Sequence, residues 1–265
     1  MRLLFQSDDF GITEAVTLGI VKGIEEGLIR NTGLFTNMPS SAFAAEFIPK
    51  LPQCCFGIDI NLVGGKPLSD PSTVKSLVDE NGNFITSIQR FKENKLVNSE
   101  MMNTVFEEDP YVYADVIVEM EAQINRYIEL VGAKPEYLHP HSLITPNIFK
   151  AMEELGAKYD IPLSSHKWQS TNFTFVPANW NIKPVFDIDK QRDTDVAKLT
   201  LESLKSVAGN ENLMIICHAG YVDADLLGVS SYSLIRARDL EMAISPELIK
   251  YVEDNNIELI TYRDL

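Results

Sequence analysis

The chain has 265 residues, of which 45% are hydrophobic and 23% charged, so it is long enough for one large α/β domain or two small ones. Its formal net charge of −15 argues against a nucleic-acid partner, because binding to a phosphate backbone depends on lysine and arginine. Three cysteines, two of them adjacent, indicate a reducing compartment, and the lack of a signal-peptide pattern or a long apolar run predicts a cytoplasmic protein with no membrane partner.

Two adjacent carboxylates, Asp8 and Asp9, follow the first predicted strand, residues 2–7. Like charges side by side repel, so a pair at the end of a strand indicates a site that supplies a cation, a metal ion or a shared proton. The structural alternative is one aspartate that caps the helix starting near Thr13 and a solvated neighbour.

Short apolar runs alternate with helical patterns along the rest of the chain. We expect further strands over 31–37, 55–62, 136–139, 161–164, 185–188, 213–217 and 257–261. We expect helices over 14–26, 41–50, 113–131, 146–155 and 194–208, and one that starts at Ser245-Pro246-Glu247. Gly27 and Gly156 are expected to end the first and the fourth of these helices.

Residues 64–112 show no sustained hydrophobic period and contain Gly64-Gly65, Asn81-Gly82 and several prolines. A connection of this length is usually functional, for example a lid or a binding loop. We therefore expect an irregular insertion here within one domain that covers residues 1–265.

The alternation of about seven strands with helices predicts parallel βαβ units closed into one barrel-like domain. In such folds the active site gathers at the carboxyl ends of the strands, so residues from distant segments can be pooled. The pooled side chains are Asp8, Asp9, Asp59, Asn61, His139, His141 and His218.

Aspartate and histidine are ligands that a divalent ion such as Zn²⁺, Mg²⁺ or Mn²⁺ accepts. His139 and His141 are two residues apart, so on an extended chain both imidazoles point to one side. A bound ion with an open position can acidify water and polarise a carbonyl, which is the minimal equipment for hydrolysing an amide or ester. A free carboxylate could take the proton of the water, and His218 could protonate a leaving amine.

Several motifs resemble the YdjC-like carbohydrate deacetylases, the family of the chitooligosaccharide deacetylases, and the likeness runs over nearly the whole chain. They are Asp8-Asp9-Phe10-Gly11, Lys66-Pro67-Leu68-Ser69, Ser76 to Phe84, Cys217-His218-Ala219-Gly220-Tyr221-Val222-Asp223, Arg238 with Glu241, and Ser245-Pro246. The resemblance implies a distorted (β/α) barrel that is often a homodimer, and a small carbohydrate as substrate.

By position, the resemblance implies that Asp9 and His139 are metal ligands, Asp8 the catalytic base and His218 the catalytic acid. Asp59 stands where the family has a histidine ligand, and we expect it to ligate the ion in its place. Further candidates for metal-supporting or substrate-binding contacts are His141, Asn61, Tyr137, Arg238 and Tyr221. Aromatic side chains that could stack on a sugar are Trp168, Phe173, Trp180 and Tyr221.

The leading hypothesis is a metal-dependent hydrolase that removes an N-acetyl group from an amino sugar in a small oligosaccharide, phosphorylated or not. Its cofactor is one divalent ion, Mg²⁺ or Zn²⁺ with Mn²⁺ as a further candidate, and the extra carboxylate of Asp59 favours the harder Mg²⁺ or Mn²⁺. The alternatives are a sugar-binding protein without turnover on the same scaffold, and a glycosidase that uses two carboxylates such as Asp8 and Asp59.

Overall fold

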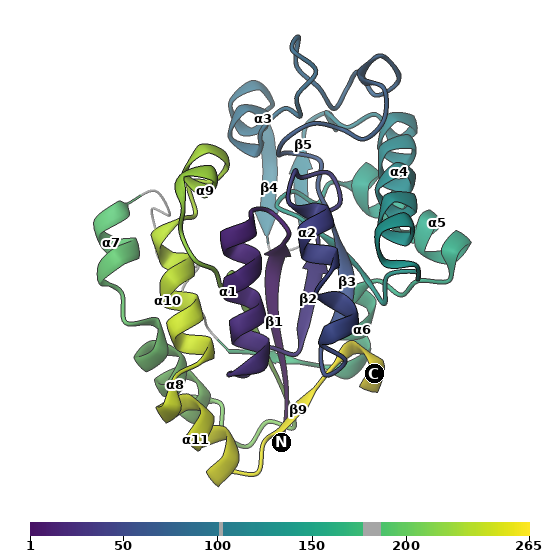
Figure 1. Ribbon diagram of the computed structural model, residues 1–265. Coiled ribbons are helices and arrows are strands. Elements are labelled where there is room, and N and C mark those ends of the chain that lie inside the picture. Colours follow the sequence, from purple (N-terminus) through teal and green to yellow (C-terminus); the bar gives the residue numbers. More distant parts are fainter. Residues whose placement is uncertain (101–102, 177–186) are drawn as a thin grey trace.

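A seven-stranded parallel sheet lies at the centre of the molecule (Figure 1), in a computed structural model that describes residues 1–100, 103–176 and 187–265. Its strands are β1 (Arg2–Phe10), β2 (Asn31–Leu34), β3 (Cys55–Ile60), β6 (Leu138–Pro140), β7 (Thr174–Phe175), β8 (Asn212–Cys217) and β9 (Glu258–Ile260). The order is β6-β3-β2-β1-β8-β7, and β9 pairs with the first residues of β1. All these pairings are parallel, so the carboxyl ends of the strands lie along one edge.

Helices cover the outside of the curled sheet (Figure 1). They are α1 (Glu14–Glu25), α2 (Ser41–Ala45), α4 (Tyr113–Val131), α5 (Pro146–Tyr159), α6 (Ser164–Thr171), α7 (Ile188–Asp193), α8 (Val196–Ser206), α9 (Ala224–Val229), α10 (Leu234–Ala243) and α11 (Pro246–Asp254). This arrangement confirms the single distorted (β/α) barrel expected from the sequence. No helix among the described residues is both long and apolar enough to cross a membrane.

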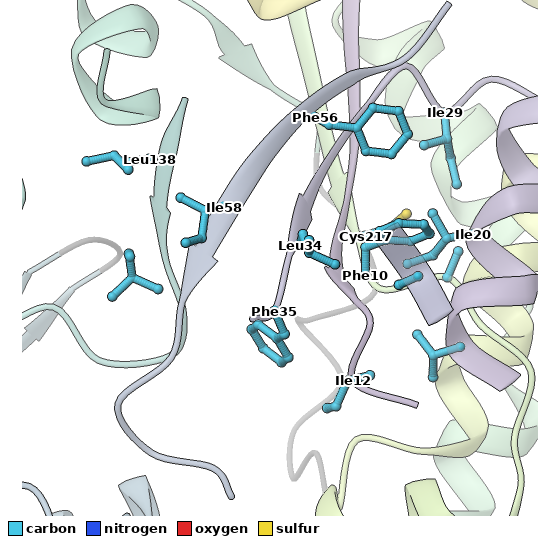
Figure 2. Packing of buried hydrophobic residues seen from close by; sticks show 14 of the residues in the cluster. Phe10, Ile12, Ile20, Ile29, Leu34, Phe35, Phe56, Ile58, Leu138 and Cys217 are labelled. Carbon is cyan, nitrogen blue, oxygen red and sulfur yellow. The ribbon is translucent and has the colours of Figure 1, made fainter. Parts of the chain in front are cut away.

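The two faces of the sheet bury different side chains because successive residues of a strand point to opposite sides. On β1, Leu3 and Phe5 belong to the large apolar cluster that also includes residues of the covering helices, such as Ile20. Leu4 belongs to a smaller cluster on the other face. Figure 2 shows part of the large cluster, in which the rings of Phe10 and Phe56 lie 5.7 Å apart. The functional residues described below lie next to this smaller cluster.

The stretch 64–112 is more ordered than its sequence predicts. It contains a 3₁₀ turn (Pro71–Thr73), helix α3 (Ser87–Glu93) and an antiparallel hairpin of β4 (Leu96–Glu100) with β5 (Asn103–Phe106). Elements of four to seven residues are too short to give a clear hydrophobic period. Glu119 on α4 is fully buried and accepts hydrogen bonds from the backbone of Leu68 and Ser69, which anchors the insertion to the barrel.

Three further sequence expectations differ from the structure. The helix expected to stop at Gly156 continues to Tyr159 and ends at Asp160, which adopts left-handed backbone angles. Gly156 serves close packing instead, because a Cβ there would lie 2.6 Å from Leu163. The expected strand 161–164 is reduced to one bridge, and α6 begins at its end. The first half of the expected strand 185–188 lies outside the described residues, and Ile188 starts α7.

Candidate functional site

A pocket of about 570 Å³ opens at the carboxyl ends of the central strands. Its aspartate, histidine and arginine lining residues are Asp8, Asp9, Asp59, His139, His141, His218 and Arg236. These seven groups come from β1, β3 and β6, from the residues that follow β6 and β8, and from α10, and all but Arg236 lie at strand ends, as the pooling of strand ends predicts. Other parts of its wall come from the start of α3 and from the segment 227–232.

Asp8, Asp59 and His139 form a compact cluster at the base of this pocket. Each offers one ligand atom, these atoms lie within 4.8 Å of one another, and all three residues are buried. Asp59 and His139 are direct partners in the register of β3 and β6. Asp8 reaches them from β1, where its Oδ2 lies 3.6 Å from His139 Nε2. Two carboxylates and an imidazole at this separation match the donor set that divalent ions accept.

The remaining contacts of the cluster hold its side chains in place. His139 Nδ1 lies 2.9 Å from Ser164 Oγ, which fixes the imidazole plane. Asp59 Oδ2 accepts a hydrogen bond of 2.8 Å from the backbone N–H of Asp9. Asp59 Oδ1, by contrast, is buried without a hydrogen-bond partner among the described residues. A buried carboxylate oxygen left without a donor is costly unless a cation fills the space beside it, so the donor set fits a metal ion.

The electrostatics of the cluster point the same way. Burial, and then repulsion by Asp8, raises the pKa of Asp59 to about 7. Burial lowers the pKa of His139, but the carboxylates of Asp8, Asp59 and Asp9 together outweigh it and raise that pKa above its ordinary value. Burial raises the pKa of Asp8, yet attraction to His139 and His218 leaves it below its ordinary value. Negative charge therefore accumulates here, and a proton on His139 or a bound cation compensates it.

Asp9 belongs to a second group that lies beside the cluster. Its Oδ2 accepts a hydrogen bond of 2.6 Å from Arg236 Nη2, and its Oδ1 lies 3.0 Å from His141 Nδ1. Burial raises the pKa of Asp9, but His141 and Arg236 hold it well below its ordinary value. Asp9 therefore stays ionised; its Oδ1, like Asp59 Oδ1, is buried without a hydrogen-bond partner among the described residues although His141 lies close to it. The resemblance implied that Asp9 is a ligand and Asp8 the base, whereas the geometry places Asp8 with Asp59 and His139.

His218 lies on the opposite wall, after the end of β8. Its Nε2 is 3.9 Å from Asp8 Oδ2, and about a quarter of its side chain is exposed. The backbone N–H of His218 donates to Asp239 Oδ2 at 2.8 Å, and its ring packs against Tyr232 at 4.9 Å. Burial lowers the pKa of His218 below its ordinary value although Asp9 and Asp8 oppose this. The imidazole is therefore neutral at neutral pH and can accept a proton.

The other predicted contacts divide into those at the pocket and those away from it. His141 lines the pocket through its pairing with Asp9. Asn61 shapes the rim, because its Oδ1 accepts from the backbone of Val63 and Gly64. Tyr137 is fully buried beneath the site and does not line the pocket.

Arg238 and Tyr221 lie outside the pocket. Arg238 forms a surface ion pair of 2.7 Å with Glu241. Arg236, which the sequence interpretation overlooked, is the arginine that reaches the site. The helical spacing of the sequence could have distinguished Arg236 from Arg238. Arg236 lies on the buried side of α10, together with Asp239, Leu240 and Ala243. Tyr221 is 43% exposed and is not part of the pocket wall.

Among the described residues, none of the aromatic side chains proposed to stack on a sugar lines the pocket. Trp168 is buried in the smaller apolar cluster, with its ring 5.5 Å from that of His139. Phe173 packs against the same cluster. Trp180 lies outside the described residues. Among the described residues, the aromatic side chains that line the pocket are Phe35 and Tyr232.

Comparisons with known proteins agree with this fold. The sequence model of the YdjC-like protein family matches residues 2–254. A carbohydrate deacetylase 2 of Listeria innocua is 31% identical over all of this chain and 99% of its own length, and a carbohydrate deacetylase of Clostridium beijerinckii is 28% identical over the full length of both. A crystal structure of an Enterococcus faecalis protein provisionally assigned to cellobiose-phosphate cleavage shares the fold, with a TM-score of 0.77, 23% identity and coverage of 99% and 98% of the two chains.

Proposed function

The chain belongs to the YdjC-like protein family, and from this premise we propose that it is a metal-dependent hydrolase that removes an N-acetyl group from an amino sugar in a small carbohydrate. Full-length relatives named carbohydrate deacetylase support the reaction class. The observation that carries the metal dependence is the buried cluster of Asp8, Asp59 and His139, in which Asp59 Oδ1 has no hydrogen-bond partner among the described residues. A homodimer and a cytoplasmic location stay predictions from the sequence.

We assign the ion to Asp8, Asp59 and His139, so Asp8 takes the place that the family resemblance implies for Asp9 as a ligand. Two carboxylates and one imidazole favour Mg²⁺ or Mn²⁺ more than a histidine-rich site does, and Zn²⁺ also accepts them. When bound, such an ion acidifies a water molecule and polarises the acetyl carbonyl.

His218 is then the group that carries the proton. The neutral imidazole takes a proton from the attacking water while the water oxygen bonds to the carbonyl carbon. The carbon–nitrogen bond breaks, and the imidazolium gives that proton to the departing nitrogen, which leaves a free amine and acetic acid, which loses its proton to water as acetate. Asp9, held ionised by Arg236 and His141, stabilises the transient positive charge on His218. Asp9 is a weak base for this step because His141 and Arg236 hold its pKa well below its ordinary value.

Acetate release tests the proposal directly. The purified protein, loaded with Mn²⁺, Mg²⁺ or Zn²⁺, is incubated with di- and trisaccharides of N-acetylglucosamine, and acetate and reducing sugar are measured separately. We expect acetate and a free amine without cleavage of the glycosidic bond. Treatment with EDTA should abolish turnover, and the added ion should restore it, because the water needs the ion to become a nucleophile.

Two results would contradict this function. Chain cleavage that persists in EDTA would favour the glycosidase with paired carboxylates, which needs no ion. Saturable binding of the sugars without any acetate release, with metal bound, would favour the binding-protein alternative.

A further inference from the structure

A chain of buried hydrogen bonds leads from the smaller apolar cluster to the carboxylate of Asp8. Trp168 Nε1 lies 2.5 Å from Tyr262 Oη, Tyr262 Oη lies 2.6 Å from Gln6 Oε1, and Gln6 Nε2 lies 2.5 Å from Asp8 Oδ1. The four residues come from α6, the C-terminal 3₁₀ turn (Tyr262–Asp264) and β1. Each has at most 7% of its surface exposed. The chain thus links three distant segments to one carboxylate.

The donor and acceptor roles along this chain have one consistent assignment. The indole of Trp168 can only donate, so the oxygen of Tyr262 accepts from it and turns its own proton toward Gln6 Oε1. Gln6 must then present its NH₂ group to Asp8, because its carbonyl oxygen is engaged by Tyr262. Asp8 Oδ1 is therefore an acceptor.

The consequence for Asp8 is a fixed orientation. With Oδ1 held by Gln6, the other oxygen, Oδ2, faces His139 Nε2 at 3.6 Å and His218 Nε2 at 3.9 Å. Neither Trp168 nor Tyr262 lines the pocket, so neither is placed to touch a substrate. The ring of Tyr262 is itself held by that of Tyr137, whose centroid lies 4.2 Å away.

We propose that Tyr262 and Trp168 are positioning residues that, through Gln6, orient Asp8 Oδ2 toward the metal ion. The inference rests on the proposed function, because it takes Asp8 as a ligand. Residues that hydrogen-bond to a metal ligand commonly change metal affinity by about 10–100-fold when they are removed. The C-terminal turn of the chain thereby becomes part of the metal site without contacting it.

The test compares two tyrosine-to-phenylalanine variants in a titration with Mn²⁺ alone, followed by electron paramagnetic resonance of the free ion. Tyr262→Phe keeps the ring but removes the proton that fixes Gln6. Tyr127→Phe is the matched control, since Tyr127 is equally buried and donates at 3.1 Å to the backbone oxygen of Phe56. We expect about a tenfold weaker Kd for Tyr262→Phe and no change for Tyr127→Phe.

A second variant covers the case in which Tyr262→Phe does not fold. Trp168→Phe removes the indole N–H that fixes the hydroxyl of Tyr262, and we expect a weaker Mn²⁺ affinity in the same direction. Equal affinities in the wild type and in folded Tyr262→Phe and Trp168→Phe would overturn the inference alone. A wild-type protein that binds no Mn²⁺ would overturn the metal site of the proposed function and this inference together.

Discussion

Replacement of His218 by glutamine is expected to lower kcat by about 10²–10⁴-fold while the affinity for Mn²⁺ stays unchanged. Glutamine fills similar space but cannot carry the proton from the water to the departing amine. His218 is not in the cluster of Asp8, Asp59 and His139, so the ion keeps its ligands. Acetate release under saturating Mn²⁺, beside a direct Mn²⁺ titration, measures both quantities.

The matched control for this variant is His166→Gln. His166 is about half exposed and lies 3.6 Å from Glu153, away from the pocket. We expect wild-type turnover from it. Wild-type turnover from His218→Gln, or a loss of Mn²⁺ binding together with activity, would contradict the role of His218.

The pH dependence of turnover provides a second check on the same residue. The pKa of His218 lies below its ordinary value of 6.5 because the imidazole is buried. A lowered pKa keeps the imidazole of His218 neutral down to a lower pH. The kcat of the metal-loaded enzyme should therefore fall only below pH 6.5. The residual activity of His218→Gln should lack this acid limb. If kcat of the variant falls over the same acid pH range as that of the wild type, the fall is caused by the titration of another group.

Gly33→Ala is expected to weaken Mn²⁺ binding on the order of a hundredfold, although residue 33 is not a ligand. Gly33 lies on β2 beside β3, and a Cβ there would stand 1.8 Å from Asp59 Oδ1 and 2.3 Å from its Cγ. No contact of that length can exist, so the carboxylate must leave its position. Mn²⁺ affinity and acetate release should fall together, and the melting temperature should fall as well.

A second crowded glycine separates the loss of the site from a general loss of stability. Gly23→Ala would place a Cβ 2.4 Å from Ile29 Cδ1, in the core beneath α1. We expect it to destabilise the fold by about 1–3 kcal/mol, as overpacking does, but to keep the Mn²⁺ affinity of the wild type. If folded Gly33→Ala binds Mn²⁺ as well as Gly23→Ala does, the placement of Asp59 in the ion site is wrong.

Much of the barrel could be predicted from the sequence, because each of its longer helices and strands buries one continuous apolar face. The stripe from Tyr113 to Val131 coincides with α4, and Gly132 ends that helix in a left-handed conformation as such glycines do. The apolar run 213–217 corresponds to β8. The hairpin of β4 and β5 was not predicted, because strands of four or five residues leave little periodic signal.

The members of the site were largely predictable, but their grouping was not. The rule that the carboxyl ends of parallel strands meet at one edge correctly placed Asp8, Asp59 and His139 in one pocket. Asp9 does not follow the alternating side-chain directions of β1, because its backbone is left-handed, with φ of +72°. Its carboxylate pairs with Arg236 from a distant helix. Such a backbone angle and such a partner depend on tertiary packing, which no local pattern records.

The assignment of the ion to Asp8 is the central claim, and a Mn²⁺ titration of Asp8→Asn and Asp9→Asn beside the wild type tests it most directly. Both variants replace one carboxylate by an amide of the same shape, at adjacent positions. We predict one Mn²⁺ per wild-type chain, binding at least about a hundredfold weaker in Asp8→Asn, and near wild-type affinity in Asp9→Asn. Loss of the ion in Asp9→Asn with retention in Asp8→Asn would contradict the account.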